Sequence, residues 1–120
     1  MAAVILHFES REVPRYAEPI TPQELREGDV YFAVRFKDDK RFIPTMYPLV
    51  YLGRGLRPDL GDRFYFQDVG SYVQHGSAVA SKIEGADLYA QLPDQLKDIF
   101  TYERALDRLL CCSLRRRGLA

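Results

Sequence analysis

Cysteine and histidine are scarce in this chain, and their scarcity excludes two kinds of site. The only cysteines, Cys111 and Cys112, are neighbours, and neighbouring cysteines seldom form a disulfide because the ring they close strains the peptide between them. The only histidines, His7 and His75, have no second histidine or cysteine at the spacing of metal ligands. The sequence therefore predicts no disulfide framework, no metal site and no cofactor. Free thiols favour a reducing cytoplasm.

Net charge and long apolar runs are lacking as well. The 120 residues carry 17 Lys plus Arg and 17 Asp plus Glu, so the chain has no overall field to attract nucleic acid or an anionic membrane. No segment approaches the roughly 20 apolar residues that span a bilayer. The apolar run at residues 2–6 is too short for a signal-peptide core, and no positive charge precedes it. We therefore expect a cytoplasmic protein that binds neither membranes nor nucleic acid.

The chain is long enough for one domain, residues 1–120, whose first part (about residues 1–76) is predicted to be rich in strands. Strands are expected at residues 4–8, 30–37, 41–43, 49–52 and 63–69, with a turn at 38–40 and a loop at 53–63. Residues 49–52 are apolar throughout, which predicts the most enclosed strand. Pro44 and Pro48 bracket an expected break in the strands, which indicates an edge or a bulge rather than a central strand.

The strand at residues 30–37 has the clearest alternation. Its predicted core face carries Val30, Phe32, Val34 and Phe36, and its outer face carries Tyr31, Ala33, Arg35 and Lys37. Before it, Thr21, Pro22 and Glu24 form a helix-start pattern. The expected fold class is α+β. Short strands with tight turns indicate a small, strongly bent antiparallel sheet, and the strand pattern over about residues 28–76 resembles an SH3-like barrel.

The C-terminal part, about residues 86–117, is predicted to be helical. A single amphipathic helix over residues 94–117 would end at Gly118, with arginines at its negative end. Its apolar stripe comprises Leu96, Ile99, Phe100, Leu106, Leu109 and Leu110. If the sheet covers only the first half, Leu106, Leu109 and Leu110 need a protein partner or a second copy of this chain. The alternative is a helix packed wholly in the core, or one that breaks near Thr101 into two pieces.

The segment FYFQDVGSYVQHGS, residues 64–77, concentrates the polar and aromatic residues of the chain. In a strand, Phe64 and Phe66 would face the core, and the residues between them would point outward. We therefore expect a binding surface made of Tyr65, Gln67, Asp68, Tyr72 and His75. Asp68 also fits a structural role, in which its carboxylate accepts from the amide of Gly70 or Ser71.

Two other functions are open to these residues. Asp68, Ser71 and His75 supply the residue types of a hydrolase, but their spacing shows neither a nucleophile elbow nor an oxyanion hole. Arg115, Arg116 and Arg117 could bind phosphates weakly, or could simply complement the end of a helix. Eight tyrosines and no recognisable catalytic motif favour a third reading. The sequence predicts a small non-enzymatic binding or accessory protein that acts through protein–protein contacts.

Overall fold

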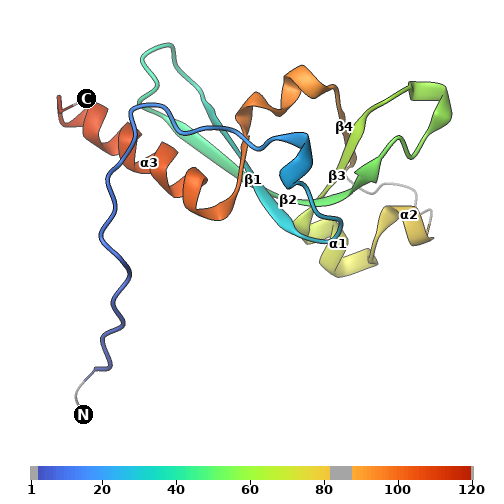
Figure 1. Ribbon diagram of the computed structural model, residues 1–120, viewed down its shortest axis with the longest axis horizontal. Helices are drawn as coiled ribbons and strands as arrows, with labels where there is room; N and C mark the ends of the chain where they lie inside the picture. The colour runs from blue at the N-terminus through green and yellow to red at the C-terminus, as the bar shows by residue number, and fades with distance from the viewer. Residues whose placement is uncertain (1–2, 82–87, 120) are drawn as a thin grey trace.

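The computed structural model describes residues 3–81 and 88–119 and shows an α+β fold built on one antiparallel sheet (Figure 1). The strands are β1 (Val30–Phe36), β2 (Pro44–Arg54), β3 (Phe64–Asp68), β4 (Leu88–Gln91) and β5 (Ile99–Phe100). The helices are α1 (Val69–His75), α2 (Ala78–Ser81) and α3 (Tyr102–Arg116), and the 3-10 segments are η1 (Pro22–Glu24), η2 (Pro58–Leu60) and η3 (Pro93–Asp98). The strands lie in the open order β4-β3-β2-β1-β5, so the α+β class is confirmed, whereas the described strands do not close into a barrel.

The hairpin between β1 and β2 turns through residues 37–43. The Asp38 carboxylate closes this turn by accepting from the amides of Phe42 (3.0 Å) and Ile43 (2.9 Å). Arg41 takes a positive φ of 57° inside the turn. The strand expected at residues 41–43 is therefore wrong, because the amides of Phe42 and Ile43 donate to the Asp38 side chain and strand β2 begins only at Pro44.

Strand β2 runs through both prolines that were expected to interrupt it. The amide of Lys37 donates to Ile43 O (2.9 Å), so the bonded pairs of the β1–β2 ladder join odd-numbered residues. The even-numbered Pro44 and Pro48 therefore direct their nitrogens away from β1. Strand β3 pairs with β2 only from Leu49 onward, so both prolines stand where that side of β2 is a free edge. The prolines thus lie at a local free edge, but β2 is the middle strand of the sheet and is not broken, so the predicted break is wrong.

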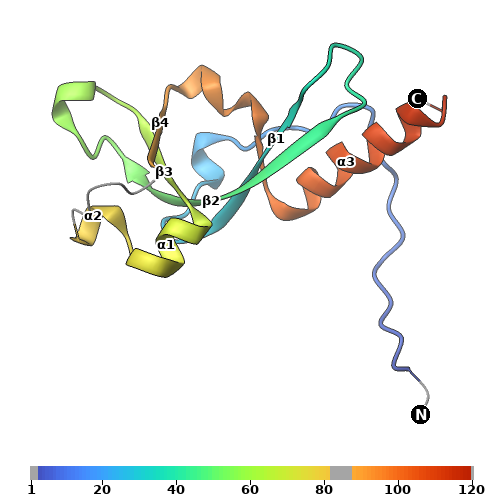
Figure 2. The same ribbon diagram turned by 180° about the vertical axis from the view of Figure 1, so that it is seen from behind.

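Different elements cover the two faces of the sheet (Figures 1 and 2). Residues 20–25 and η3 cover one face, whose core contains Ile20, Tyr31, Ala33, Leu49, Tyr51, Phe64, Phe66, Leu96 and Ile99. On the other face α3 packs at one end, against Val34 and Phe100. At the opposite end of that face, α1 and α2 pack against Val50 and Leu52. Because both faces are covered, Tyr31 and Ala33 are buried, and their expected outward orientation is wrong. Residues 49–52 are all buried, as predicted.

The first residues of the described chain form an extended arm rather than the strand expected at residues 4–8. The arm runs away from the body beside α3 (Figure 1). Val4, Ile5, Leu6 and Phe8 are between 74 and 89% exposed. The apolar alternation is present, but it lacks a neighbouring strand to supply hydrogen bonds, and alternation alone cannot stabilise a strand.

The single helix expected over residues 94–117 is broken, as the alternative anticipated. Residues 93–98 form η3, Ile99 and Phe100 pair with β1 as β5, and α3 begins after Thr101. At the other end, Gly118 (φ 73°) donates to Arg115 O, and Leu119 donates to Leu114 O (2.8 Å). These two bonds form a Schellman motif, which confirms Gly118 as the end of the helix.

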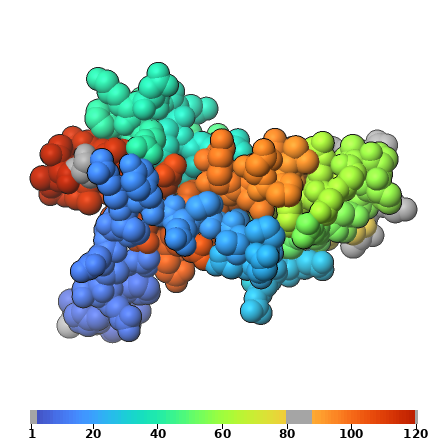
Figure 3. Space-filling model, turned by 45° about the horizontal axis from the view of Figure 1, so that its top comes forward, coloured from blue at the N-terminus to red at the C-terminus, as the bar shows by residue number. Residues whose placement is uncertain are grey.

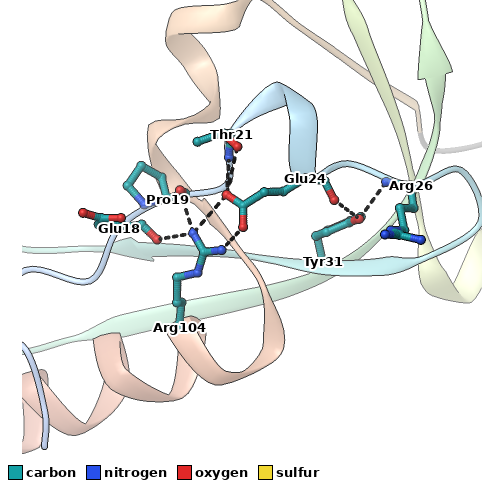
Figure 4. A network of polar contacts seen from close by, with 7 residues as sticks. All are labelled: Glu18, Pro19, Thr21, Glu24, Arg26, Tyr31 and Arg104. Carbon is teal, nitrogen blue, oxygen red and sulfur yellow. Dashed lines mark hydrogen bonds and ion pairs between the residues drawn. The ribbon is translucent and has the colours of Figure 1, made fainter.

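A polar network ties η1 to α3 and β1 (Figure 4). Arg104 forms an ion pair with Glu24 and donates to Pro19 O (3.1 Å). The amide and hydroxyl of Thr21 both donate to the Glu24 carboxylate, so the predicted helix start forms a single 3-10 turn. The Tyr31 hydroxyl donates to Glu24 O (3.1 Å). The hydrogen bonds from Arg104 and Thr21 lower the pKa of Glu24 from about 4.5 to about 2.

Candidate functional site

Gln67 lies inside the protein, not on the predicted binding surface. Its side chain is 0% exposed because α1 and α2 cover this face of β3. Its amide donates to Ser71 Oγ (3.0 Å) and to Gly76 O (3.1 Å), and it accepts from the Ala78 amide (2.9 Å). Three bonds to three points on the α1–α2 segment make Gln67 the link between the sheet and these helices.

Tyr65 and Tyr72 belong to the same packed layer. Tyr65 is buried against Leu52 and Ala78, so its predicted outward orientation is also wrong. Its hydroxyl is closed to water and has no hydrogen-bond partner within the described chain. Tyr72 is half-buried at the edge of this cluster. The predicted surface therefore loses Tyr65 and Gln67 to the core.

Asp68, Ser71 and His75 do not assemble a nucleophile and a base. Asp68 Oδ2 accepts from the Ser71 amide (3.1 Å), so Asp68 caps α1, and the structural reading of this residue is confirmed. The buried Ser71 hydroxyl accepts from Gln67 instead of donating to an imidazole. His75 is exposed at the last turn of α1 and makes no hydrogen bond to either residue. The arrangement is that of a capped helix.

A cleft of about 260 Å³ lies on the face of the sheet that η1 and η3 partly cover. Its floor consists of Ala33, Leu49 and Ile99, all of them buried. Its polar walls come from Arg35 on β1, Tyr47 on β2, and Tyr89 and Gln91 on β4. Strand β4 is three positions from β1 in the sheet, so it lines the same cavity only because the sheet curves toward this face. We call this feature the tyrosine cleft.

The polar groups of the tyrosine cleft are largely unused by the fold. Tyr47 and Tyr89 are 45 and 43% exposed, and their hydroxyls bond to no part of the chain that the structure describes. Arg35 approaches Asp98 at 3.8 Å (Nε to Oδ2), which is a loose, half-exposed ion pair. The Gln91 amide likewise has no hydrogen bond within residues 3–81 and 88–119. A bound molecule would thus meet an apolar floor and several free donors.

Sequence reasoning missed the tyrosine cleft because its residues come from four strands that are far apart in the chain. The one available signal was the odd-numbered face of residues 30–37. That face was predicted to point outward at Arg35, and Arg35 does so. No local spacing shows that Tyr89 and Tyr47 line the same cleft, because this arrangement depends on sheet curvature.

A second hollow, which we call the α3 groove, runs between α3 and the free edge of β2. A small cavity of about 40 Å³ at one end is lined by Phe32, Met46, Tyr102, Ala105 and Leu106. A wider one of about 390 Å³ follows along the helix, lined by Pro44, Leu109, Cys112, Ser113, Arg116 and Arg117. In the predicted partner stripe, Leu106 and Leu110 are 39 and 45% exposed, whereas Leu109 is half-buried against the core. The structure thus leaves two of the three leucines open.

The C-terminal arginines divide between two roles. Arg115 donates to Arg41 O (2.9 Å from Nη2) and lies over the Phe36 ring, so it holds the hairpin against α3. Arg116 and Arg117 are exposed and line the end of the α3 groove. The thiols of Cys111 and Cys112 are free and buried in α3. Only two of the three arginines are therefore available to a ligand.

Comparison with known proteins gives no further guide to function. No protein-family model matches this chain, and neither a curated protein nor a solved structure matches it. Within the described ranges, no group of three or more histidine, cysteine or acidic residues is placed to hold a metal ion. No helix in that part of the chain is long and apolar enough to cross a bilayer.

Proposed function

We propose that this protein is a small, non-enzymatic binding or accessory protein that acts through protein–protein contacts at the tyrosine cleft. The observation that carries the proposal is a set of polar groups around a buried apolar floor: Arg35 is only loosely paired, and Tyr47, Tyr89 and Gln91 have no side-chain hydrogen bond within the described chain. Tyrosine and arginine are the residues that most often dominate binding energy at protein interfaces. The free, buried thiols of α3 support a cytoplasmic setting.

The chemistry of the cleft favours a peptide segment with an apolar side chain beside an acceptor. The floor of Ala33, Leu49 and Ile99 accommodates the apolar group, and burying it is favourable by about 25 cal/mol per Å². The guanidinium of Arg35 and the two tyrosine hydroxyls can donate to a carboxylate or a backbone carbonyl. Since Asp98 engages Arg35 only loosely, an incoming carboxylate can replace it.

A displayed library of random linear peptides, selected on the full chain, tests this proposal. Selected peptides are then measured by calorimetry against the wild type and against two cleft variants, Arg35→Met and Tyr89→Ala. We expect binding to weaken at least about tenfold in each, which corresponds to about 1.4 kcal/mol. The matched control is Tyr16→Ala, because Tyr16 is exposed and lies outside the cleft. A selection that yields no peptide, or peptides that bind both cleft variants as tightly as the wild type, contradicts the proposal.

A further inference from the structure

The N-terminal arm, residues 3–9, carries a run of strongly exposed hydrophobic side chains. Four large hydrophobic side chains, Val4, Ile5, Leu6 and Phe8, extend into solvent. The arm projects from one end of the molecule (Figure 3). It contributes to a radius of gyration of 16.7 Å, against about 13 Å for a compact chain of 100 residues. A contiguous exposed apolar segment marks an interaction site.

The root of the arm is fixed to one flank of α3. Arg11 forms an ion pair with the buried Asp107 (2.7 Å), and the Cys111 thiol donates to Arg15 O (3.3 Å). Asp107 and Cys111 are four residues apart and so share this flank. The point at which the arm leaves the body is therefore defined, while the arm itself remains unpartnered in the described chain.

The α3 groove lies on the other flank of α3 and has the complementary composition. Its floor is apolar at Leu106 and Leu109, and its far end carries the exposed Arg116 and Arg117. The arm has the same order of features, with apolar residues first and Glu9 directly after them. Seven extended residues span about 23 Å at 3.3 Å each, and the 15 residues of α3 span about 22 Å at 1.5 Å each. The arm therefore matches the groove in length, and the charge of Glu9 complements that of Arg116 and Arg117.

We propose that the arm of one copy of this chain lies in the α3 groove of a second copy, and that the second copy returns the same contact. Each copy has one arm and one groove, so two reciprocal contacts close a twofold dimer without a free end. A second copy fits better than the chain's own arm, because the arm is anchored at Asp107, on the flank opposite the groove, and runs away from the body (Figures 1 and 2). In this arrangement Glu9 pairs with Arg116 and Arg117.

Docking in the groove depends on side chains rather than on strand addition. The free edge of β2 beside the groove carries Pro44 and Pro48, whose nitrogens face that edge and cannot donate. Only the Met46 amide remains between them as a donor. An arm seated there is therefore held by its apolar residues and by Glu9, and its affinity is sensitive to single polar substitutions.

Sedimentation analysis of the full chain over a range of concentrations tests the arrangement. The arm variant is Leu6→Asp with Phe8→Asp, the groove variant is Leu106→Asp, and the control is Val73→Asp at an exposed apolar position of α1. We expect the wild type to dimerise and the arm and groove variants to dimerise at least tenfold more weakly, with the control unchanged. The double variant Arg116→Glu and Arg117→Glu should act in the same direction without touching the core, which covers the case in which Leu106→Asp fails to fold.

Mixing the two defective chains separates arm exchange from other modes of association. The arm variant keeps an intact groove and the groove variant keeps an intact arm, so the mixture should form a heterodimer with one of the two contacts. That heterodimer should be tighter than either homodimer. A wild type that stays monomeric at all concentrations, a dimer that survives the arm variant, or a mixture that fails to associate would each overturn the proposal. The tyrosine cleft takes no part in this contact, so Arg35→Met should leave dimerisation unchanged.

Discussion

Each face of the sheet carries a polar region, and the two regions differ in whether their side chains form hydrogen bonds within the protein. On the face covered by α1 and α2, the polar side chain of Gln67 is buried and all of its bonds are made within the protein. On the opposite face, the tyrosine cleft is lined by the polar side chains of Arg35, Tyr47, Tyr89 and Gln91. Within the described chain they form only the loose ion pair between Arg35 and Asp98. A buried polar group needs a hydrogen-bond partner within the protein, whereas an exposed one can bond to water or to a ligand. Internal hydrogen bonding, more than residue type, therefore separates Gln67 from the residues of the candidate site, and the buried Tyr65 hydroxyl, which has no partner within the described chain, is an exception on the covered face.

The largest expected effect comes from Gln67→Leu. The substitution leaves the Ala78 amide, the Ser71 hydroxyl and Gly76 O without their partner, and each buried group left unpaired is costly. We expect the free energy of unfolding to fall by about 3 kcal/mol, measured by urea denaturation. Gln91→Leu in the cleft is the matched control and should change it by less than about 0.5 kcal/mol. Equal losses in the two variants would remove the distinction between the faces.

Two buried tyrosines, one on each face of the sheet, give the opposite contrast, because the bonded hydroxyl is on the face with the cleft. The Tyr31 hydroxyl accepts from the Arg26 amide (2.8 Å) and donates to Glu24 O, so Tyr31→Phe should cost about 1.5 kcal/mol. The Tyr65 hydroxyl is buried and has no partner among residues 3–81 and 88–119, so Tyr65→Phe should leave stability unchanged or raise it by up to about 1 kcal/mol. Thermal or urea unfolding of the pair is the measurement. A clear loss in Tyr65→Phe would show that its hydroxyl is bonded in solution.

The Glu24–Arg104 network gives an effect that depends on pH. Because the hydrogen bond from Arg104 lowers the pKa of Glu24 to about 2, the carboxylate stabilises the fold above about pH 4.5, and this contribution is lost as pH falls toward 2. The pair is partly exposed, so we expect Glu24→Gln to cost only about 1 kcal/mol at pH 7 after solvent screening. Unfolding curves of the wild type and the variant should converge between pH 4.5 and pH 2. A gap that stays constant down to pH 2 would rule out the ion pair as its source.

The smallest expected effect on stability lies in the cleft itself. Arg35→Met removes only a loose ion pair and should change the unfolding free energy by less than about 0.5 kcal/mol. Tyr47→Phe should do the same, since its hydroxyl has no partner in the described chain. Differential scanning calorimetry measures both variants. A fall of more than about 1 kcal/mol in the free energy of unfolding of either variant would show that the cleft residues stabilise the fold and are not free to bind a ligand.

Local chemistry was read correctly from the sequence where neighbouring residues decide the structure. The Asp68 cap, the Gly118 helix end and the enclosed strand at residues 49–52 all follow from residues close together in the chain. The core positions of Phe64 and Phe66 follow from alternation in the same way.

The sequence-based predictions were wrong where a segment far away in the chain determines the burial or pairing of a residue. Tyr65 and Gln67 alternate as outward residues should, yet α1 and α2 fold back over them. Ile99 and Phe100 fit a helix, but pairing with β1 takes them into the sheet. The arm at residues 4–8 fits a strand and lacks the neighbour that a strand needs. Alternation predicts which residues share a face, and only the fold determines what covers that face.

The attachment of the N-terminal segment to α3 also dictates the order in which the chain can be completed. Arg11 binds Asp107 across 96 residues, and Glu24 binds Arg104 across 80. During synthesis residues 11–24 leave the ribosome before α3, so they cannot reach their final places until residues 102–116 have emerged. The β1–β2 hairpin can form earlier, because its contacts are local. A growing chain therefore carries its apolar arm unanchored until α3 has emerged, and loss of α3 at any stage releases the arm again.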